Sequence, residues 1–355
     1  MKNRKLILLL LLPLAFLLLG YLHWLTNWER VADPVMSRNI TDKERYRPDG
    51  RSGEIITQDE TAIWYEDRVR EHFPMDGDQE RIAYILRGWN GLLAYIPEGV
   101  DSYIVPIPIP ILYEREGTED CRRYKDFIEG LSERTGDRGE VINLYETMSE
   151  HKEEYLYYGE TGVLTNVGGY YASDGLLKAM GESGLPALAE YEEELYVMEE
   201  ASELTYLYSL PGSKGYCEVF TVDDSGQVHA MKKPVIRDGG AADGTVIADG
   251  YHNWAVIEGD GGIEEGVALL IGDRSAKVMA PFLANHFQKV YYVFLDWDYY
   301  FGTKYHPIDK IFEEYDIRKV ILAQWASDIG EVGEMTAFSE LRKRDGGDSF
   351  DRSVE

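Results

Sequence analysis

The spacing of apolar residues changes along the 355-residue chain, and each change predicts a different kind of element. Apolar side chains recur three and four positions apart over 60–73 and again over 79–95, which predicts two helices. The next segment, Ser102 to Tyr113, reads SYIVPIPIPILY. Because proline has no amide hydrogen to donate to a sheet, the strand should end near Val105 and continue as an extended loop.

Helical spacing returns over 121–135, and a short strand is expected over 141–145. A glycine-bearing loop, 159–169, precedes a helix that should run from about Tyr170 to Met180. The acidic segment EYEEELYVMEE, within 187–201, favours one more helix. Its carboxylates form either a solvated face or an acidic docking surface.

The pattern then changes to a period of two, which is typical of strands with one buried face. The runs that share it are LTYLYSL, YCEVFTV, QVHAMKKPV, GTVIADG and NWAVIEG. Glycine-containing turn signals separate several of these runs, as at Pro211-Gly212. We therefore expect an antiparallel β insertion over about 204–257.

After the insertion the chain alternates between strand and helix again. The expected strands are 267–272, 290–296 and 319–324, and the expected helices are 276–287 and 308–315. This alternation predicts parallel βαβ units in a three-layer, doubly wound α/β fold, whose site lies beyond the carboxyl ends of the strands. Three segments should meet there: the prolines after Val105, the loop 159–169 and the turn Asp273 to Ser275.

The amino terminus predicts a membrane segment. Lys2, Arg4 and Lys5 precede an apolar run from Leu6 to about Tyr21, which is a secretory signal or a signal anchor. No small-x-small cleavage site follows, which favours an uncleaved single-pass anchor at the cell membrane; a cleaved signal is the alternative. The positive-inside rule then puts the N-terminus in the cytoplasm and the main domain outside the cell.

This reading divides the chain into consecutive parts. The predicted parts are an anchor at 1–27, a stalk at 28–53, the main domain at 54–330 and a polar tail at 331–355. The main domain contains the β insertion and is long enough for one large α/β core.

The net charge of −28 restricts the possible partners. Nucleic acid is excluded, because its phosphates require lysine and arginine, and adsorption to anionic lipid is disfavoured. An acidic surface serves solubility, or else reflects an acid-loving or halophilic setting.

The sequence gives no indication of a metal or cofactor, and we expect neither. The two cysteines, Cys121 and Cys217, match no metal spacing, and whether they form a disulfide stays open. Asp238, Asp243 and Asp249 do not follow the calcium-loop pattern and are interpreted as hairpin turns.

A family resemblance covers roughly 102–324. It is carried by the strand with VPIP and by the segments VINLYETMSEHKEEYLYYGETGVLTNVGGYYA, LLIGDRSAKVMAPFLANHFQKVYYVFLDWDYY and YDIRKVIL. These resemble the DHHW family of extracytoplasmic SGNH-hydrolase-like proteins of Gram-positive bacteria and, more distantly, the alginate O-acetylation proteins. The resemblance implies a flavodoxin-like fold and a role in cell-surface polysaccharide modification, often beside a membrane-bound O-acyltransferase.

The catalytic pattern that the resemblance implies is absent from this chain. The family's nucleophilic serine follows Gly/Lys-Asp at the strand end, and a gapless match through Pro281-Phe282-Leu283 places Arg274 there. The signature Asp-His-His-Trp falls on Thr161, Gly162, Val163 and Leu164, with the register fixed by Thr165, Gly168, Gly169 and Tyr170. Arginine cannot attack a carbonyl. We therefore expect a pseudoenzyme with no catalytic residues.

The same turn remains the best candidate for ligand binding. Asp273, Arg274 and Ser275 form it, with Arg274 as an anion clamp, and the backbone amides near Gly259 and Gly261 could bind an anion as well. The expected ligand is an envelope polysaccharide or a partner protein of an O-acylation system.

Two alternatives remain. In one, the protein is an active O-acetyltransferase or esterase with Ser275 as nucleophile and a histidine such as His252 as base. Against this, a serine that opens a helix is usually an N-cap, and His286 reads as a capping or surface histidine near a helix end. In the other, the domain is a structural scaffold without a ligand.

Overall fold

The computed structural model describes residues 55–58, 62–65, 69–74, 79–136, 139–154, 156–157, 162–197, 204–209, 216–222, 228–234, 254–258, 264–295, 307–329, 338 and 341–342. All of them fall in one compact unit. Within these residues, no helix is long and apolar enough to span a bilayer. The predicted anchor at 1–27 and the stalk at 28–53 lie outside the described residues.

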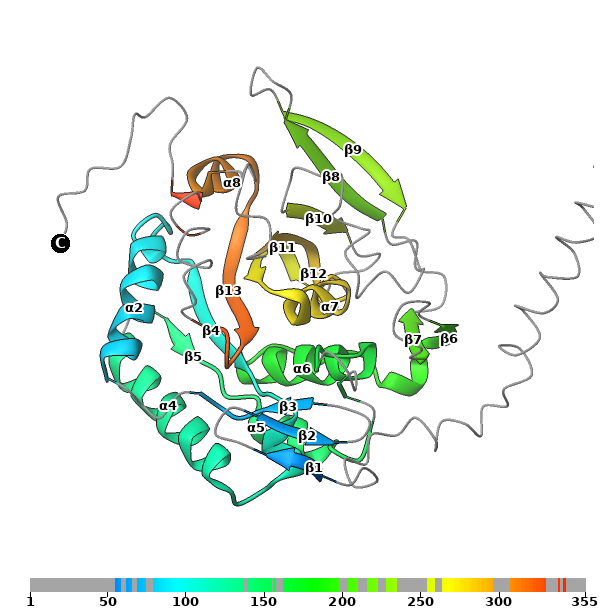
Figure 1. Ribbon diagram of the computed structural model, residues 1–355. Helices are drawn as coiled ribbons and strands as arrows, with labels where there is room; N and C mark the ends of the chain where they lie inside the picture. The colour runs from blue at the N-terminus through cyan, green and yellow to red at the C-terminus, as the bar shows by residue number, and fades with distance from the viewer. Residues whose placement is uncertain are drawn as a thin grey trace, which may run out of the picture. The chain divides into compact units, whose positions relative to one another are not determined.

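The centre of the fold is a mixed sheet with the strand order β5-β4-β13-β11-β12-β10-β8-β9 (Figure 1). The neighbouring strands β5, β4, β13, β11 and β12 of this order pair in parallel. Their bounds are β4 Asp101–Ile107, β5 Glu140–Val141, β11 Glu264–Gly272, β12 Phe287–Phe294 and β13 Ile317–Trp325. The remaining strands pair antiparallel: β8 Tyr216–Val222, β9 Val228–Pro234 and β10 Trp254–Glu258. The predicted α/β sheet with an antiparallel insertion is confirmed, and the described strands β8, β9 and β10 of the insertion extend the main sheet. The run GTVIADG lies outside the described residues.

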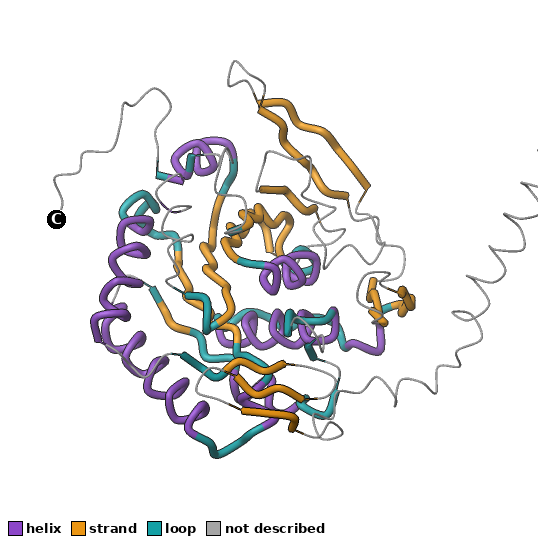
Figure 2. Tube along the Cα trace, in the orientation of Figure 1, coloured by secondary structure: helices purple, strands orange, loops and turns teal. Residues whose placement is uncertain are grey.

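Helices cover both faces of this sheet (Figure 2). Along β11, Val267, Leu269 and Ile271 face a core that includes α2 Gln79–Leu93, α4 Glu119–Thr135 and α8 Ile308–Glu314. The alternate residues Ala268 and Leu270 face a second core with α6 Asn166–Ala179 and α7 Arg274–Leu283. Because successive side chains of a strand point to opposite faces, this alternation is the signature of a three-layer arrangement.

Strand β4 runs two residues further than predicted and contains Pro106. The carbonyl of Ile104 accepts the amide of Ile142, so Ile104 and Pro106, two residues further on, present their backbone to the β5 side of the strand. Because β5 ends at Val141, no strand lies opposite Pro106 on that side. The Pro106 carbonyl accepts a hydrogen bond from the Tyr124 hydroxyl instead. Proline is therefore tolerated, because no strand amide is required there.

Several element boundaries in this region differ from prediction. The chain turns into the short helix α3, Ile111–Glu114, where an extended loop was expected. The expected strand over 141–145 is only β5, and helix α5, Tyr145–Glu150, follows it. Helix α6 begins at Asn166, four residues before the predicted start.

The predicted helix over 60–73 is wrong. The structure has strands β1 Ile55–Gln58, β2 Ala62–Tyr65 and β3 Val69–Glu71 in a small antiparallel sheet. Ala62 pairs with Glu71 and Ile63 with Arg70. The apolar residues of these short paired strands lie at spacings that a helix also shows. The spacing of apolar residues alone therefore could not distinguish a helix from strands here.

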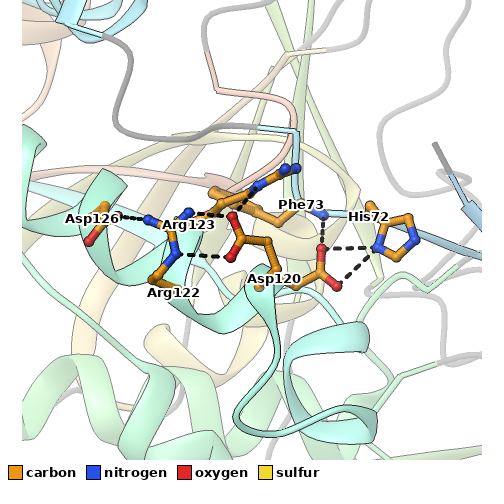
Figure 3. Close-up of polar contacts among 7 residues, drawn as sticks. His72, Phe73, Asp120, Arg122, Arg123 and Asp126 are labelled. Carbon is orange, nitrogen blue, oxygen red and sulfur yellow. Dashed lines mark hydrogen bonds and ion pairs between the residues drawn. The ribbon is translucent and has the colours of Figure 1, made fainter. Parts of the chain in front are cut away.

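This small sheet is joined to helix α4 through a buried carboxylate (Figure 3). Asp120, 3% exposed, accepts the amide of Phe73 at 2.9 Å and lies 3.0 Å from Nδ1 of His72. The phenyl ring of Phe73 packs edge-on against Tyr124 at 5.5 Å. The residues just after β3 are thus held to the first two turns of α4.

The acidic helix predicted for 187–201 is also wrong. A single 3₁₀ turn, Leu188–Glu190, is followed by strand β6, Glu192–Val197, which pairs antiparallel with β7, Leu204–Ser209. Glutamate favours helices in isolation, but the adjacent β-forming run provides a hydrogen-bonding partner that overrides this weak preference.

Within the stretch predicted to be a polar tail, two apolar side chains are described. Phe338 and Leu341 are buried in the core, and the Phe338 ring lies 6.4 Å from that of Trp89 on α2.

Candidate functional site

The turn between β11 and α7 is organised by Asp273, which is the N-cap of α7. One carboxylate oxygen accepts the amides of Ser275 at 2.8 Å and Ala276 at 3.2 Å, and the other accepts the Trp325 amide at 2.6 Å. Capping by a carboxylate satisfies amides that have no partner within the helix. The expectation that Ser275 caps the helix is therefore wrong; Asp273 does so two residues earlier.

The Asp273 carboxyl is partly buried. Burial raises its pKa to about 6, against the lowering effect of the three amides it accepts. The Tyr292 hydroxyl donates to the Asp273 carbonyl at 2.6 Å, which fixes the backbone of the turn from β12. Asp273 thus ties together α7 and the ends of two strands, and its role is structural.

Ser275 faces the interior. The residue is 2% exposed, and its hydroxyl oxygen accepts the backbone amide of Leu164 at 3.4 Å. Leu164 is the last of the four positions that correspond to the family signature. The predicted meeting of the loop 159–169 with the Asp273 turn is therefore confirmed, but it is a packing contact and does not present the serine to solvent.

Arg274 lies at the surface. It is exposed, and among the described residues its side chain has no hydrogen bond or ion pair. An exposed guanidinium therefore occupies the position where the resemblance places a nucleophile.

Trp325, the last residue of β13, was not singled out from the sequence. A Cβ atom at Gly162 would lie 2.9 Å from Cη2 of the Trp325 indole and 3.4 Å from Cγ of Pro110, and Gly162 has φ +65°. The indole thus fills the space that a side chain at 162 would need, and 162 is one of the two positions matched to the family's histidines. The only sequence signal was a large aromatic residue directly after an apolar strand at the functional edge of the sheet.

The register residues of the resemblance have clear structural roles. Thr165 is the N-cap of α6, and its hydroxyl accepts the Gly168 amide at 3.2 Å. A Cβ at Gly169 would lie 2.6 Å from a methyl of Val278 on α7. Gly169 therefore permits the close approach of α6 and α7, which lie next to one another in Figure 1.

Other predicted residues lie elsewhere or outside the described part of the chain. Thr161, Gly259, Gly261 and His252 are outside it, as are Asp238, Asp243 and Asp249, and Val163 is partly buried beside Gly162. Cys121 carries a free thiol, so it is not paired with Cys217.

His286 is not a surface histidine. It is 1% exposed, and neither ring nitrogen has a hydrogen-bond partner among the described residues. Its Nε2 lies 3.6 Å from the Glu182 carboxylate. The residue directly precedes β12, at the amino edge of the sheet, whereas Ser275 lies at the carboxyl edge, so His286 cannot be its base.

No family model and no curated protein matches this chain. Among solved structures, the chain is similar to a DHHW family protein from Eubacterium siraeum, with a TM-score of 0.62 and 14% identity over 81% of this chain and 98% of that one. It is also similar to PatB1 of Bacillus cereus, with a TM-score of 0.56 and 14% identity over 79% and 99% of the two chains. A PatB1 structure with a sulfonyl adduct has a TM-score of 0.56 and 15% identity, over 81% of this chain and 98% of that one.

These similarities show the fold of this chain. The chain has the SGNH-like α/β fold of DHHW family proteins, so the predicted resemblance is confirmed at the level of the fold. At this identity, the chemistry has to be argued from the residues of the site itself.

Proposed function

We propose that this chain is a catalytically inactive SGNH/DHHW-like protein of the cell envelope, and that it binds an anionic group through Arg274. The group belongs to a surface polymer or to a partner in polysaccharide O-acylation, such as a membrane-bound O-acyltransferase. The N-terminal segment anchors the domain at the outer side of the membrane. A reporter enzyme fused after residue 53 tests this orientation, because it should be active only outside the cell.

The proposal rests on one observation at the helix N-terminus. Arg274 is exposed at the position matched to the nucleophile, while the neighbouring hydroxyl of Ser275 is buried against Leu164. A serine nucleophile needs a base within hydrogen-bond reach and access to substrate. Ser275 has neither among the described residues.

The same geometry supports the Arg274 side chain as the binding group. The Ser275 and Ala276 amides at the start of α7 are occupied by the Asp273 carboxylate, so they are not available to an external anion. The guanidinium of Arg274 has donors in a planar fork that suits carboxylate and phosphate groups. Recognition therefore depends on the Arg274 side chain, and the geometry of its fork makes lysine an incomplete substitute.

Binding of defined polymers by the full chain tests this role. Polygalacturonate supplies carboxylates and lipoteichoic acid supplies phosphodiesters. Arg274→Ala should weaken binding of the preferred polymer about tenfold or more, and Arg274→Lys should restore only part of it. Arg87→Ala, which removes an exposed arginine from α2, is the matched control and should bind normally. Equal binding by Arg274→Ala and the parent would overturn the proposal.

The competing function is an active esterase or O-acetyltransferase that uses Ser275. PatB1, which shares the fold, has been seen with a sulfonyl adduct. We expect no turnover of an aryl acetate above that of buffer. Turnover by the parent that is lost in Ser275→Ala, with the variant folded, would replace our proposal with the enzymatic one.

A further inference from the structure

The segment between α6 and β6, residues 180–191, is fastened to the rest of the domain at several points. The Leu185 amide donates to the Asp174 carboxylate of α6 at 2.8 Å, and the Tyr170 hydroxyl donates to the Pro186 carbonyl at 2.9 Å. We call this segment the α6–β6 connection, because it leads from the helix into the two-stranded β6–β7 sheet.

An ion pair fastens the start of this connection to the amino edge of the main sheet. A Glu182 oxygen lies 3.0 Å from Nζ of Lys319 on β13, and the same ammonium donates to Asp101 on β4 at 3.1 Å. Glu182 and Lys319 are 15% and 14% exposed. Burial lowers the pKa of Lys319, but its hydrogen bonds to Glu182 and Asp101 outweigh this effect and raise the pKa above its ordinary value. The lysine therefore stays charged.

The buried imidazole of His286 faces the same carboxylate from the other side. Its Nε2 lies 3.6 Å from the second Glu182 oxygen, and neither ring nitrogen has a hydrogen-bond partner among the described residues. Burying a polar group without a hydrogen bond costs free energy. With a neutral imidazole, Glu182, Asp101 and Lys319 carry a formal charge of −1 together. A proton on His286 brings this charge to zero and gives Nε2 a charge-assisted bond to Glu182.

Titratable groups from every neighbouring element surround this cluster. They are Glu182 from the connection, Asp174 and Lys178 from α6, Asp101 and Tyr103 from β4, Glu140 from β5 and Lys319 from β13. Burial raises the pKa of Tyr103, so this phenol stays neutral. Histidine is the side chain that ordinarily changes its charge between about pH 5 and pH 8. His286 is therefore the group through which pH acts on the cluster.

We propose that His286 is a proton-dependent fastening for the α6–β6 connection. At acidic pH the imidazole carries a proton and pairs with Glu182, so the connection is held by His286 and Lys319 together. As the pH rises the proton is lost, and Lys319 alone holds Glu182. The stabilisation is thus present at low pH and absent at high pH. This inference is independent of the proposed function, because Arg274 lies at the carboxyl edge of the sheet.

Hydrogen exchange on the full chain tests the proposal, with mass spectrometry of the peptides that cover 180–191. The protection factors, corrected for the intrinsic exchange rate at each pH, should be about tenfold higher at about pH 5.5 than at about pH 7.5. His286→Gln keeps a polar side chain but does not titrate, and it should remove this difference. Asp273 is present in both proteins, so its own pH dependence cancels in the comparison.

Two further variants make the outcome decisive. Glu182→Gln removes the carboxylate from a partly exposed position and should also remove the difference, which gives a result even if His286→Gln fails to fold. His151→Gln is the matched control, because His151 pairs with Glu154 at the surface, and it should leave the difference intact. Equal protection of the parent at the two pH values, or greater protection at the higher one, would overturn the proposal. So would a difference that persists in Glu182→Gln or disappears in His151→Gln.

Discussion

The backbone amide of Leu164 donates to the hydroxyl oxygen of Ser275 at 3.4 Å, in the interior of the protein. These residues are 111 positions apart and belong to the two segments in which the resemblance places catalytic groups. In this chain the same two segments meet through a hydrogen bond that supports packing. The role of the Ser275 hydroxyl that the structure shows is therefore to stabilise the fold.

Ser275→Ala should therefore reduce stability without changing any activity. Removing the hydroxyl leaves the buried Leu164 amide without this partner, which costs about 1 kcal/mol or somewhat more. Urea unfolding measures the change. Ser327→Ala, where the hydroxyl bonds to its exposed neighbour Asp328, should change stability by less than about 0.5 kcal/mol. Equal effects of the two substitutions would contradict the assignment.

Asp273 should make stability depend on pH in an unusual direction for a carboxylate. Its native pKa is about 6 and its ordinary value is 3.8, so the native state binds the proton more tightly than the unfolded state. The stabilisation that this raised pKa gives to the native state is present in full below about pH 4 and is lost as the pH rises through about 6. At about 1.4 kcal/mol per pKa unit, the loss is on the order of 3 kcal/mol.

Comparison with Asp273→Asn isolates this effect, because asparagine keeps an oxygen for capping but does not titrate. The free energy of unfolding of both proteins should be measured from pH 4 to pH 8. The parent should lose stability relative to the variant up to about pH 6, and the difference should then stay constant. A difference that grows in favour of the parent as the pH rises would show that the native pKa is not raised.

Gly162→Ala should test how closely the Trp325 indole fills the neighbouring space. The substitution adds a methyl group 2.9 Å from the indole at a position with φ +65°. Gly117→Ala is the matched control, because Gly117 has φ +75° and open space around it. Both should lose the roughly 1–2 kcal/mol of a left-handed residue, and Gly162→Ala should lose about 1 kcal/mol more.

A double variant shows whether the indole is the cause. In a Trp325→Leu background, the additional cost of Gly162→Ala over Gly117→Ala should largely disappear. If the cost persists there, the conflict lies with Pro110 or the backbone, and Trp325 is not the residue that fills the site.

The contact between His72 and Asp120 should couple the small N-terminal sheet to α4. A double-mutant cycle with His72→Gln and Asp120→Asn keeps similar shapes and an acceptor for the Phe73 amide. We expect a coupling energy of about 1 kcal/mol, because Asp120 is buried. The exposed pair Lys125 and Glu129, 3.7 Å apart on α4, should give no more than about 0.3–0.5 kcal/mol. Similar coupling energies in both pairs would mean that the burial of Asp120 does not strengthen its interaction with His72.

The parts of the fold that could be predicted from sequence are those in which local pattern and tertiary environment agree. The run Val267 to Gly272 is apolar throughout because β11 is covered on both faces, and the alternation after it gave the correct parallel units. The segments 60–73 and 187–201 failed because their partners are neighbouring strands that periodicity does not reveal. A residue's local preference decides little when a strand partner is close in the chain.

The candidate site, too, could be predicted from the sequence only in part. The convergence of the turn at Asp273 with the loop near Leu164 followed from topology, because the carboxyl ends of parallel strands share one edge. The N-cap role of Asp273 had a local sequence signal, an aspartate directly before the helix, but Ser275 was also a plausible cap. The position of the Trp325 indole could not be predicted, because it depends on the distance between a strand end and a loop more than 150 residues earlier in the chain.

The indole of Trp325 restricts which residues position 162 can accept. A larger side chain at 162 would overlap the indole, and loss of the tryptophan alone would leave a void beside Gly162. The residues at 162 and 325 are therefore constrained as a pair, and a larger residue at 162 requires a smaller one at 325.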